Sequence, residues 1–214
     1  MRLEDYTADA ICRAMGLDGF IEPAWEQAEN PTLRVVLTPS FHPELCITFT
    51  STGDTAILSV VALAEQFWAQ KSMVYLPTNQ EQCAFSPEIF QEVQGLLREA
   101  HTAFNPERRY VCCDGMGSES CLVSRSETKR LCAHISQLEQ ADRFLRRLLD
   151  LAWESCHDPR VQNALAHGAW YLGIECPMRE VPDREPVTRL AVLGTPQERQ
   201  DLFDSLKSRK KDKG

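Results

Sequence analysis

The chain has 214 residues, of which 43% are hydrophobic and 25% charged, and its formal net charge is −8. This composition is typical of a folded protein and excludes wholesale disorder. The acidic balance argues against nucleic acid or an anionic membrane as a partner, because phosphate binding needs clustered Lys and Arg. The longest apolar run, 56–64, is far shorter than the roughly 20 residues of a membrane-spanning helix, so no transmembrane segment is expected.

Nine cysteines are many for this length, but their number is odd and the chain opens on polar residues rather than on a secretory signal pattern. A reducing cytoplasm is therefore the expected compartment. In such a compartment most cysteines are small buried hydrophobic residues rather than disulfide partners. Neither a disulfide framework nor a bound metal is needed to explain how a chain of this size folds.

Seven runs have the alternation or composition of β-strands: 32–38, 45–50, 56–62, 73–76, 109–113, 118–124 and 128–134. The first three follow one another with brief connections, which predicts an antiparallel meander. The last two are separated by a connection short enough for a hairpin. A further run, 187–193, is a possible edge strand.

Helices are expected at 7–17, 87–104, 137–156, 159–172 and 196–206, with a short helical turn within 23–29. The segment 137–156 has the cleanest helical period, and its apolar positions cover about 200° of the circumference, wider than the stripe of a surface helix. It should therefore be a central helix. The helix from Pro87 should begin with the Ser86 side chain accepting from free first-turn amides, and its apolar arc suits one face of a sheet. The helix at 7–17 has few large apolar groups and should pack at a margin.

These elements predict an α+β fold: a mainly antiparallel sheet of about six strands covered by two amphipathic helices, with C-terminal helices added. Three prolines fall within 177–186, and prolines interleaved with charges are typical of a loop. We therefore expect an α+β domain over 1–176 and a C-terminal extension over 177–214, which ends in a basic tail.

The densest group of soft metal ligands is Cys112, Cys113, Cys121, Cys132 and His134. Its spacing lacks the paired C-x2-C pattern of zinc sites, and adjacent cysteines on a strand point to opposite faces. Cys132 and His134 do share a face, which leaves them as the metal candidates. Buried structural thiols remain the favoured interpretation, and we expect neither a metal nor a cofactor.

Two turns carry the candidate binding residues. Pro43 fixes a turn in which the His42 imidazole and the Glu44 carboxylate are expected to lie near each other, where they could exchange protons or bind a cation. Asp114 and Gly115 form a second turn, and the glycines at 115 and 117 would let a ligand or partner approach the backbone closely. The alternative interpretation is structural: a hydrogen bond for His42 and Glu44, and a simple turn for Asp114.

The sequence Leu37-Thr38-Pro39-Ser40-Phe41-His42-Pro43, followed by Gly53-Asp54 and later by Cys113-Asp114-Gly115, resembles a group of uncharacterised small bacterial proteins. These pair a Ser/Thr-Phe-His-Pro turn with a later Asp-Gly. The resemblance covers roughly 33–155 and implies an α+β fold and a bacterial origin, but it transfers no active residue, and the tryptophan expected after the Asp-Gly is absent. The order of elements is also similar to that of small acidic immunity proteins, an analogy of fold and charge only.

Three functions remain open. The favoured one is a non-enzymatic, intracellular protein-binding role of the immunity-protein or inhibitor type, which presents an acidic surface to a partner, possibly a basic one. The second is a metal-dependent hydrolase or other small-molecule enzyme that uses His42, Glu44 and Asp114, provided that the two turns meet at one end of the sheet. The third is a scaffold subunit of a larger complex, which a large exposed apolar patch would indicate.

Overall fold

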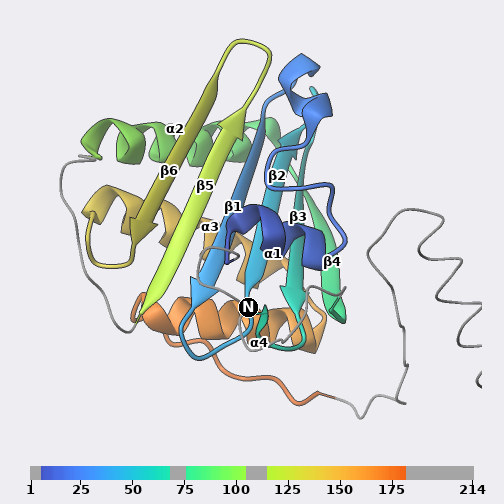
Figure 1. Ribbon diagram of the computed structural model, residues 1–214, viewed down its shortest axis with the longest axis vertical. Coiled ribbons are helices and arrows are strands. Elements are labelled where there is room, and N and C mark those ends of the chain that lie inside the picture. Colours follow the sequence, from blue (N-terminus) through green and yellow to red (C-terminus); the bar gives the residue numbers. More distant parts are fainter. Residues whose placement is uncertain (1–5, 68–75, 105–114, 182–214) are drawn as a thin grey trace, which may run out of the picture.

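A six-stranded antiparallel sheet forms the centre of the fold in the computed structural model, which describes residues 6–67, 76–104 and 115–181 (Figure 1). The strand order is β4-β3-β2-β1-β5-β6. The strands are β1 (Thr32–Pro39), β2 (Leu45–Ser51), β3 (Ala56–Leu63), β4 (Thr78–Phe85), β5 (Met116–Val123) and β6 (Thr128–His134). The first four form the predicted meander and its extension, and β5 and β6 form the predicted hairpin.

Four α-helices and one 3-10 helix accompany the sheet in the described part of the chain. They are α1 (Ala8–Ala14), η2 (Pro23–Gln27), α2 (Pro87–Ala103), α3 (Glu139–Ser155) and α4 (Pro159–Tyr171). The chain leaves β4 at one edge of the sheet, passes through α2, and returns as β5 beside β1 (Figure 1). This crossover places β1 in the interior of the sheet, between β2 and β5.

One face of the sheet packs against α2, α3 and α4, and this layer contains the larger hydrophobic core. The α3 side chains of Phe144, Leu145 and Leu148 are buried there, opposite strand residues such as Leu33 and Ile47. Sequence analysis predicted that α3 would be central, and its apolar face is buried as expected. The α+β class and the antiparallel sheet are likewise confirmed.

The opposite face of the sheet has a second, smaller core beneath α1, where Ile11 and Cys12 are fully buried against β1 and β2 residues such as Val36 and Cys46. The sequence assigned this helix to a margin, because its apolar side chains are small. Their burial completes the covering of β1, which is buried at nearly every position. Figure 1 shows α1 on one side of the sheet and α2 and α3 on the other.

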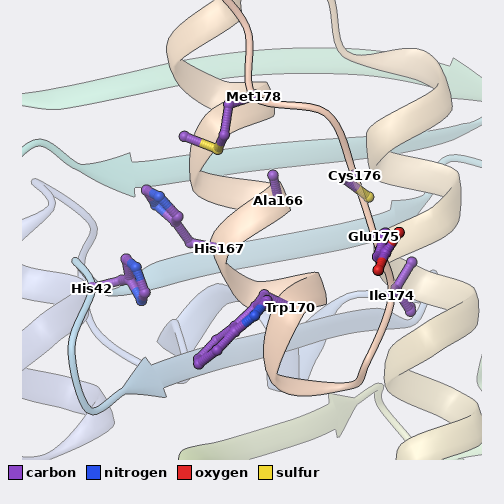
Figure 2. A pocket seen from close by; sticks show the side chains of 8 residues that line it. All are labelled: His42, Ala166, His167, Trp170, Ile174, Glu175, Cys176 and Met178. Carbon is purple, nitrogen blue, oxygen red and sulfur yellow. The ribbon is translucent and has the colours of Figure 1, made fainter.

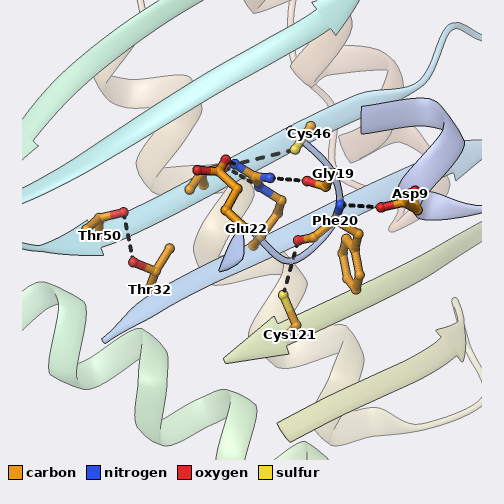
Figure 3. A network of polar contacts seen from close by, with 10 residues as sticks. Asp9, Gly19, Phe20, Glu22, Thr32, Cys46, Thr50 and Cys121 are labelled. Carbon is orange, nitrogen blue, oxygen red and sulfur yellow. Dashed lines mark hydrogen bonds and ion pairs between the residues drawn. The ribbon is translucent and has the colours of Figure 1, made fainter. Parts of the chain in front are cut away.

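Arg34 of β1 points into this second core and is only 2% exposed. Its guanidinium donates to the Glu22 carboxylate at 2.7 Å and to the Gly19 carbonyl at 2.5 Å, and both acceptors are seen in Figure 3. Its Nε donates to Thr48 Oγ1 at 2.9 Å, and the Trp25 ring lies 4.3 Å from its Cζ. A buried guanidinium is tolerated only when such partners replace its water shell. Arg34 therefore fastens the segment between α1 and β1 to the sheet.

Four predicted elements differ from the structure or lie outside its described residues. A strand was expected at 73–76, but Leu76 is not in a strand and 73–75 are outside the described residues, whereas the strand β4 was not predicted. Its sequence is largely polar because it is an edge strand with one half-exposed face. The expected elements at 109–113, 187–193 and 196–206 also lie outside the described residues.

The Ser86 side chain does not cap α2 through a first-turn amide as predicted. Its hydroxyl instead bonds the Glu88 carboxylate, and this hydrogen bond lowers the pKa of Glu88. A carboxylate is a stronger acceptor than a neutral group, so it attracts the hydroxyl hydrogen. The domain boundary at residue 176 stays a prediction, although 177–181 lie against α4, where Arg179 N donates to Asn163 Oδ1 at 2.6 Å.

Truncation of α3 tests its central place in the fold. Leu148→Ala should lower the free energy of unfolding by about 2–5 kcal/mol, because it leaves a cavity in the core. Glu154→Ala, on the exposed side of the same helix, should have a much smaller effect. Urea denaturation followed by circular dichroism measures both, and equal losses would contradict the assignment of the buried face.

The Arg34 network provides a second stability test. Arg34→Ala should destabilise the protein by about 2–4 kcal/mol, because it removes buried packing and leaves polar acceptors unsatisfied. Arg143→Ala serves as the control, since it breaks an exposed ion pair with Glu99 and such pairs contribute little. If thermal or urea unfolding gave the two variants the same stability, Arg34 would not anchor the N-terminal segment.

Candidate functional site

The candidate site begins at the connection between β1 and β2, residues 40–44, which the hairpin side of the sheet holds in place. Ser40 N and Ser40 Oγ donate to the Gly115 carbonyl at 2.9 and 2.8 Å, and Gly115 N donates back to Ser40 Oγ at 3.0 Å. Gly115 has φ = 150°, a conformation that favours glycine. The two turns singled out in the sequence therefore meet at one end of the sheet. Asp114 itself lies outside the described residues.

His42 lies against the helix α4 rather than against its sequence neighbour Glu44. Its imidazole stacks on that of His167, with ring centroids 4.0 Å apart and an angle of 23° between the planes. Its Nδ1 lies 3.2 Å from the hydroxyl of Tyr171, which also accepts from Phe41 N at 3.1 Å. Because the hydroxyl accepts from the backbone, its own hydrogen is available to Nδ1, which favours the His42 tautomer with its proton on Nε2.

The position of α4 is set at its N-terminal end and along its buried side. Asp158 caps the helix by accepting from Arg160 N at 2.7 Å. The carboxylate of Glu81, from β4, accepts from His157 N and Asp158 N at 2.8–2.9 Å. Gly168 faces the sheet, where a side chain at that position would meet Leu37. These contacts direct His167 and Trp170 toward the connection that carries His42.

A pocket of about 380 Å³ opens between this connection, α4 and the chain that follows α4 (Figure 2). Its wall is mostly apolar, and the stacked imidazoles together with Glu175 form its polar part. The lining residues are His42, Ala166, His167, Trp170, Ile174, Glu175, Cys176 and Met178. Trp170 packs edge-on against Tyr171, with centroids 5.0 Å apart, yet its side chain remains largely exposed.

Both imidazoles are held in the neutral form. Burial lowers the pKa of His42, and it lowers the pKa of His167 together with the electrostatic effect of His42. Two protonated rings in contact would repel each other, so the stack favours at most one charge. At neutral pH the pair therefore contributes flat, uncharged ring surface to the pocket.

The stacked arrangement does not suit a metal ion shared by the two histidines. Imidazole lone pairs lie in the ring plane, so stacked rings direct them side by side instead of toward one point. Among the residues that the structure describes, no group of three or more His, Cys, Asp or Glu side chains is placed to hold a metal. Cys132 and His134, the candidates from the sequence, are both exposed on β6. Neighbouring side chains partly desolvate the Cys132 thiol, and this effect together with the Glu119 charge raises its pKa, which disfavours the thiolate.

Glu44, the other candidate in this connection, points to the α1 side of the sheet and is fully buried. Its carboxylate accepts from the Tyr6 hydroxyl and from Phe67 N, each at 2.8 Å. Burial raises the pKa of Tyr6, so its hydroxyl remains a donor. The structure thus assigns Glu44 hydrogen bonds that fasten the N-terminal segment, and directs His42 to the opposite face. The sequence analysis expected the His42 and Glu44 side chains to lie near each other, but they point to opposite faces of the sheet.

Sequence reasoning missed the α4 half of the pocket. His167 stood alone in the sequence and carried no argument, but Trp170 and Tyr171 follow it by three and four residues. That spacing places all three on one side of a helix. An aromatic stripe on the helix predicted at 159–172 was the available signal. Its meeting with His42 depended on the tertiary fold.

Comparisons with known proteins found no matching family model, no matching curated protein and no matching solved structure. The resemblance to small bacterial proteins therefore stays a prediction. Within the described residues, every helix is too short or too polar to cross a membrane.

The stacked histidines predict a pH dependence of stability. A histidine whose pKa is lowered by folding binds its proton more readily in the unfolded state, so its contribution to stability is lost as the pH falls through about 6.5 and is intact above it. His167→Gln should therefore show a smaller loss of stability than wild type between pH 7.5 and 5.5. Urea unfolding at the two values measures the difference, and NMR titration should place both imidazole midpoints below 6.5. Midpoints at or above 6.5 would contradict the neutral stack.

Proposed function

We propose that this chain is a non-enzymatic, intracellular protein-binding protein, and that the pocket beside α4 receives an apolar side chain of its partner. One observation carries the proposal: a tryptophan that is 62% exposed borders an apolar cavity. An indole that stays in water contributes no free energy of burial, whereas tryptophans at the centre of protein interfaces contribute more binding energy than most residues.

Further exposed apolar side chains extend this surface beyond the pocket. Phe41 is 62% exposed and adjoins His42 in the same connection, and Met178 is 55% exposed on the pocket wall. Together with Trp170 these residues provide an apolar contact area that extends outside the pocket. A small molecule bound within the pocket would leave part of this area uncovered. Flexible and aromatic side chains of this kind are enriched at protein interfaces. A polypeptide partner therefore fits the surface better than a small ligand.

Charge favours a basic partner. The chain carries eight more acidic than basic charges, and Glu175 places one carboxylate on the pocket wall. Asp150 of α3 lies near Cys176, where its charge adds to the effect of burial in raising the pKa of that thiol. Arg146 and Arg179 nearby keep their positive charges while they donate to the Leu172 carbonyl and to Gln162, so the acidic excess belongs to the chain as a whole. An acidic surface of this kind speeds the encounter with a positively charged partner.

The class of partner follows from these features. We propose a segment with a large apolar residue flanked by Lys or Arg, presented by another protein in the reducing cytoplasm. The seven cysteines among the described residues are all free thiols, which suits that compartment. An immunity protein or inhibitor would use such a surface to occupy a basic site on its target.

Selection from a displayed library of random peptides tests the proposal. Selected peptides should share an apolar or aromatic residue next to Lys or Arg, and their affinity should fall as salt is added. Trp170→Ala should weaken their binding by tenfold or more, the loss typical of an interface anchor. Fluorescence polarisation or calorimetry with one selected peptide measures the affinities.

Two matched variants make this test specific. Phe104→Ala removes a partly exposed aromatic side chain at the end of α2, which does not line the pocket, and it should leave the affinity unchanged. Glu175→Gln should weaken binding at low salt and have less effect at high salt. If the selected peptides bound Trp170→Ala as tightly as wild type, the proposed binding surface would be wrong.

A further inference from the structure

Two cysteine thiols from distant parts of the chain lie in contact near the start of α4, and neither of them lines the pocket. Cys83 belongs to the edge strand β4, and Cys156 directly follows α3. Their Sγ atoms are 3.8 Å apart. Cys156 is fully buried, whereas Cys83 is partly exposed, so only one of the two sulfurs is open to a reagent in solution.

The other described cysteines lack this combination of a near partner and access. Cys12, Cys46 and Cys121 belong to the buried core beneath α1 and have no exposed surface to speak of. Cys132 is exposed, and the residue paired with it on the neighbouring strand is Glu119 rather than a cysteine. Cys176 is partly exposed, but it lies on the pocket wall, to which no other described cysteine contributes. A reagent that enters from solvent would therefore meet Cys83 with a second thiol already behind it.

We propose that Cys83 and Cys156 form an intramolecular disulfide when the protein meets hydrogen peroxide. In the first step the Cys83 thiolate attacks one peroxide oxygen, the O–O bond breaks, and hydroxide leaves and takes up a proton to form water. In the second step the Cys156 sulfur attacks the resulting sulfenic acid, the S–S bond forms, and the S–O bond breaks to release a second water. Two thiols lose two electrons and two protons, and one peroxide is reduced to two waters.

The geometry suits the second step. The two sulfurs must close from 3.8 Å to the roughly 2.0 Å of a disulfide. Cys83 lies on an edge strand, whose outer side has no neighbouring strand among the described residues, and Cys156 directly follows the last residue of α3. The Cys83 thiol donates to the Ser155 carbonyl at 3.2 Å, which holds its sulfur toward the residue that precedes Cys156.

The surroundings of the two thiols also determine how fast peroxide oxidises them. Burial raises the pKa of both thiols, and the nearby Glu81 carboxylate adds to the effect at Cys83. The reactive thiolate is therefore scarce at neutral pH, and oxidation should be slow there and faster as the pH rises. This behaviour separates the pair from a catalytic peroxidase cysteine, whose thiol pKa is lowered.

The bond would join the sheet edge to the start of α4. Glu81 already binds the amides of His157 and Asp158, and the Gln162 side chain donates to the Cys156 carbonyl at 2.8 Å. A disulfide at this position would add a covalent link between distant segments, which stabilises the folded state by constraining the unfolded chain. The inference does not rest on the proposed partner binding, because it concerns residues outside the pocket.

Peroxide oxidation of the purified full chain tests the proposal. Wild type and Cys132→Ser should each yield a linked peptide pair that contains Cys83 and Cys156, found by digestion without reductant and mass spectrometry. The pair should form several-fold faster at pH 8.5 than at pH 7.0, and the thermal midpoint of the oxidised protein should rise by a few degrees and return on reduction. Cys83→Ser, a change at a partly exposed position, should abolish the link and the shift.

Several results would overturn the inference. One is oxidation of Cys132 with Cys83 and Cys156 still free after the same treatment. Another is a disulfide that joins Cys83 to a different cysteine. A third is a thermal shift that persists in Cys83→Ser. Because Cys156 is buried, Cys156→Ser is used only if circular dichroism shows that this variant folds. The test is decided by Cys83→Ser whether or not Cys156→Ser folds.

Discussion

The burial of α3 against the sheet is the constraint on which the rest of this structure depends. Phe144, Leu145 and Leu148 lie in the core with almost no exposed surface, and each such side chain contributes on the order of 1.5–3 kcal/mol relative to exposure. The helix can bury this broad face only between the strands on one side and α2 and α4 on the others. Its direction therefore fixes where α4 begins and which end of the sheet α4 reaches.

The pocket is a consequence of that placement. The chain turns between α3 and α4 within three residues, and Glu81 of β4 binds two amides of this turn. The turn is thereby tied to the sheet edge, and α4 is directed across the sheet toward the connection between β1 and β2. The neutral imidazoles of His42 and His167 pack where these two elements meet. The wall of the pocket is therefore formed jointly by α4, the chain that follows it and the connection between β1 and β2.

The fold was more predictable from the sequence than the site, for a physical reason. Helix α3 and strands β1 to β3 have strong periodic patterns because at least one face of each is buried. Such a pattern can be recognised in the sequence without knowing which element packs against it. Strand β4 was missed because its edge position lets polar residues such as Gln80 and Gln82 remain in the strand. The burial of Arg34 has no local signal in the sequence, since it depends on Glu22 and Thr48 from other elements.

The connection at residues 40–44 shows why the site was only half visible. Its residue types indicated a functional turn, and the structure does place this turn beside Gly115 at one end of the sheet. Glu44 continues the alternation of β2 and therefore shares a face with the buried Cys46, whereas His42 lies in the turn before Pro43, where strand alternation does not apply. Glu44 then serves the core beneath α1, while His42 meets an aromatic stripe more than a hundred residues later in the sequence. His42 and Glu44 are thus close in the sequence but separate in the structure. Tertiary packing supplies the partners of His42, which no local sequence pattern predicts.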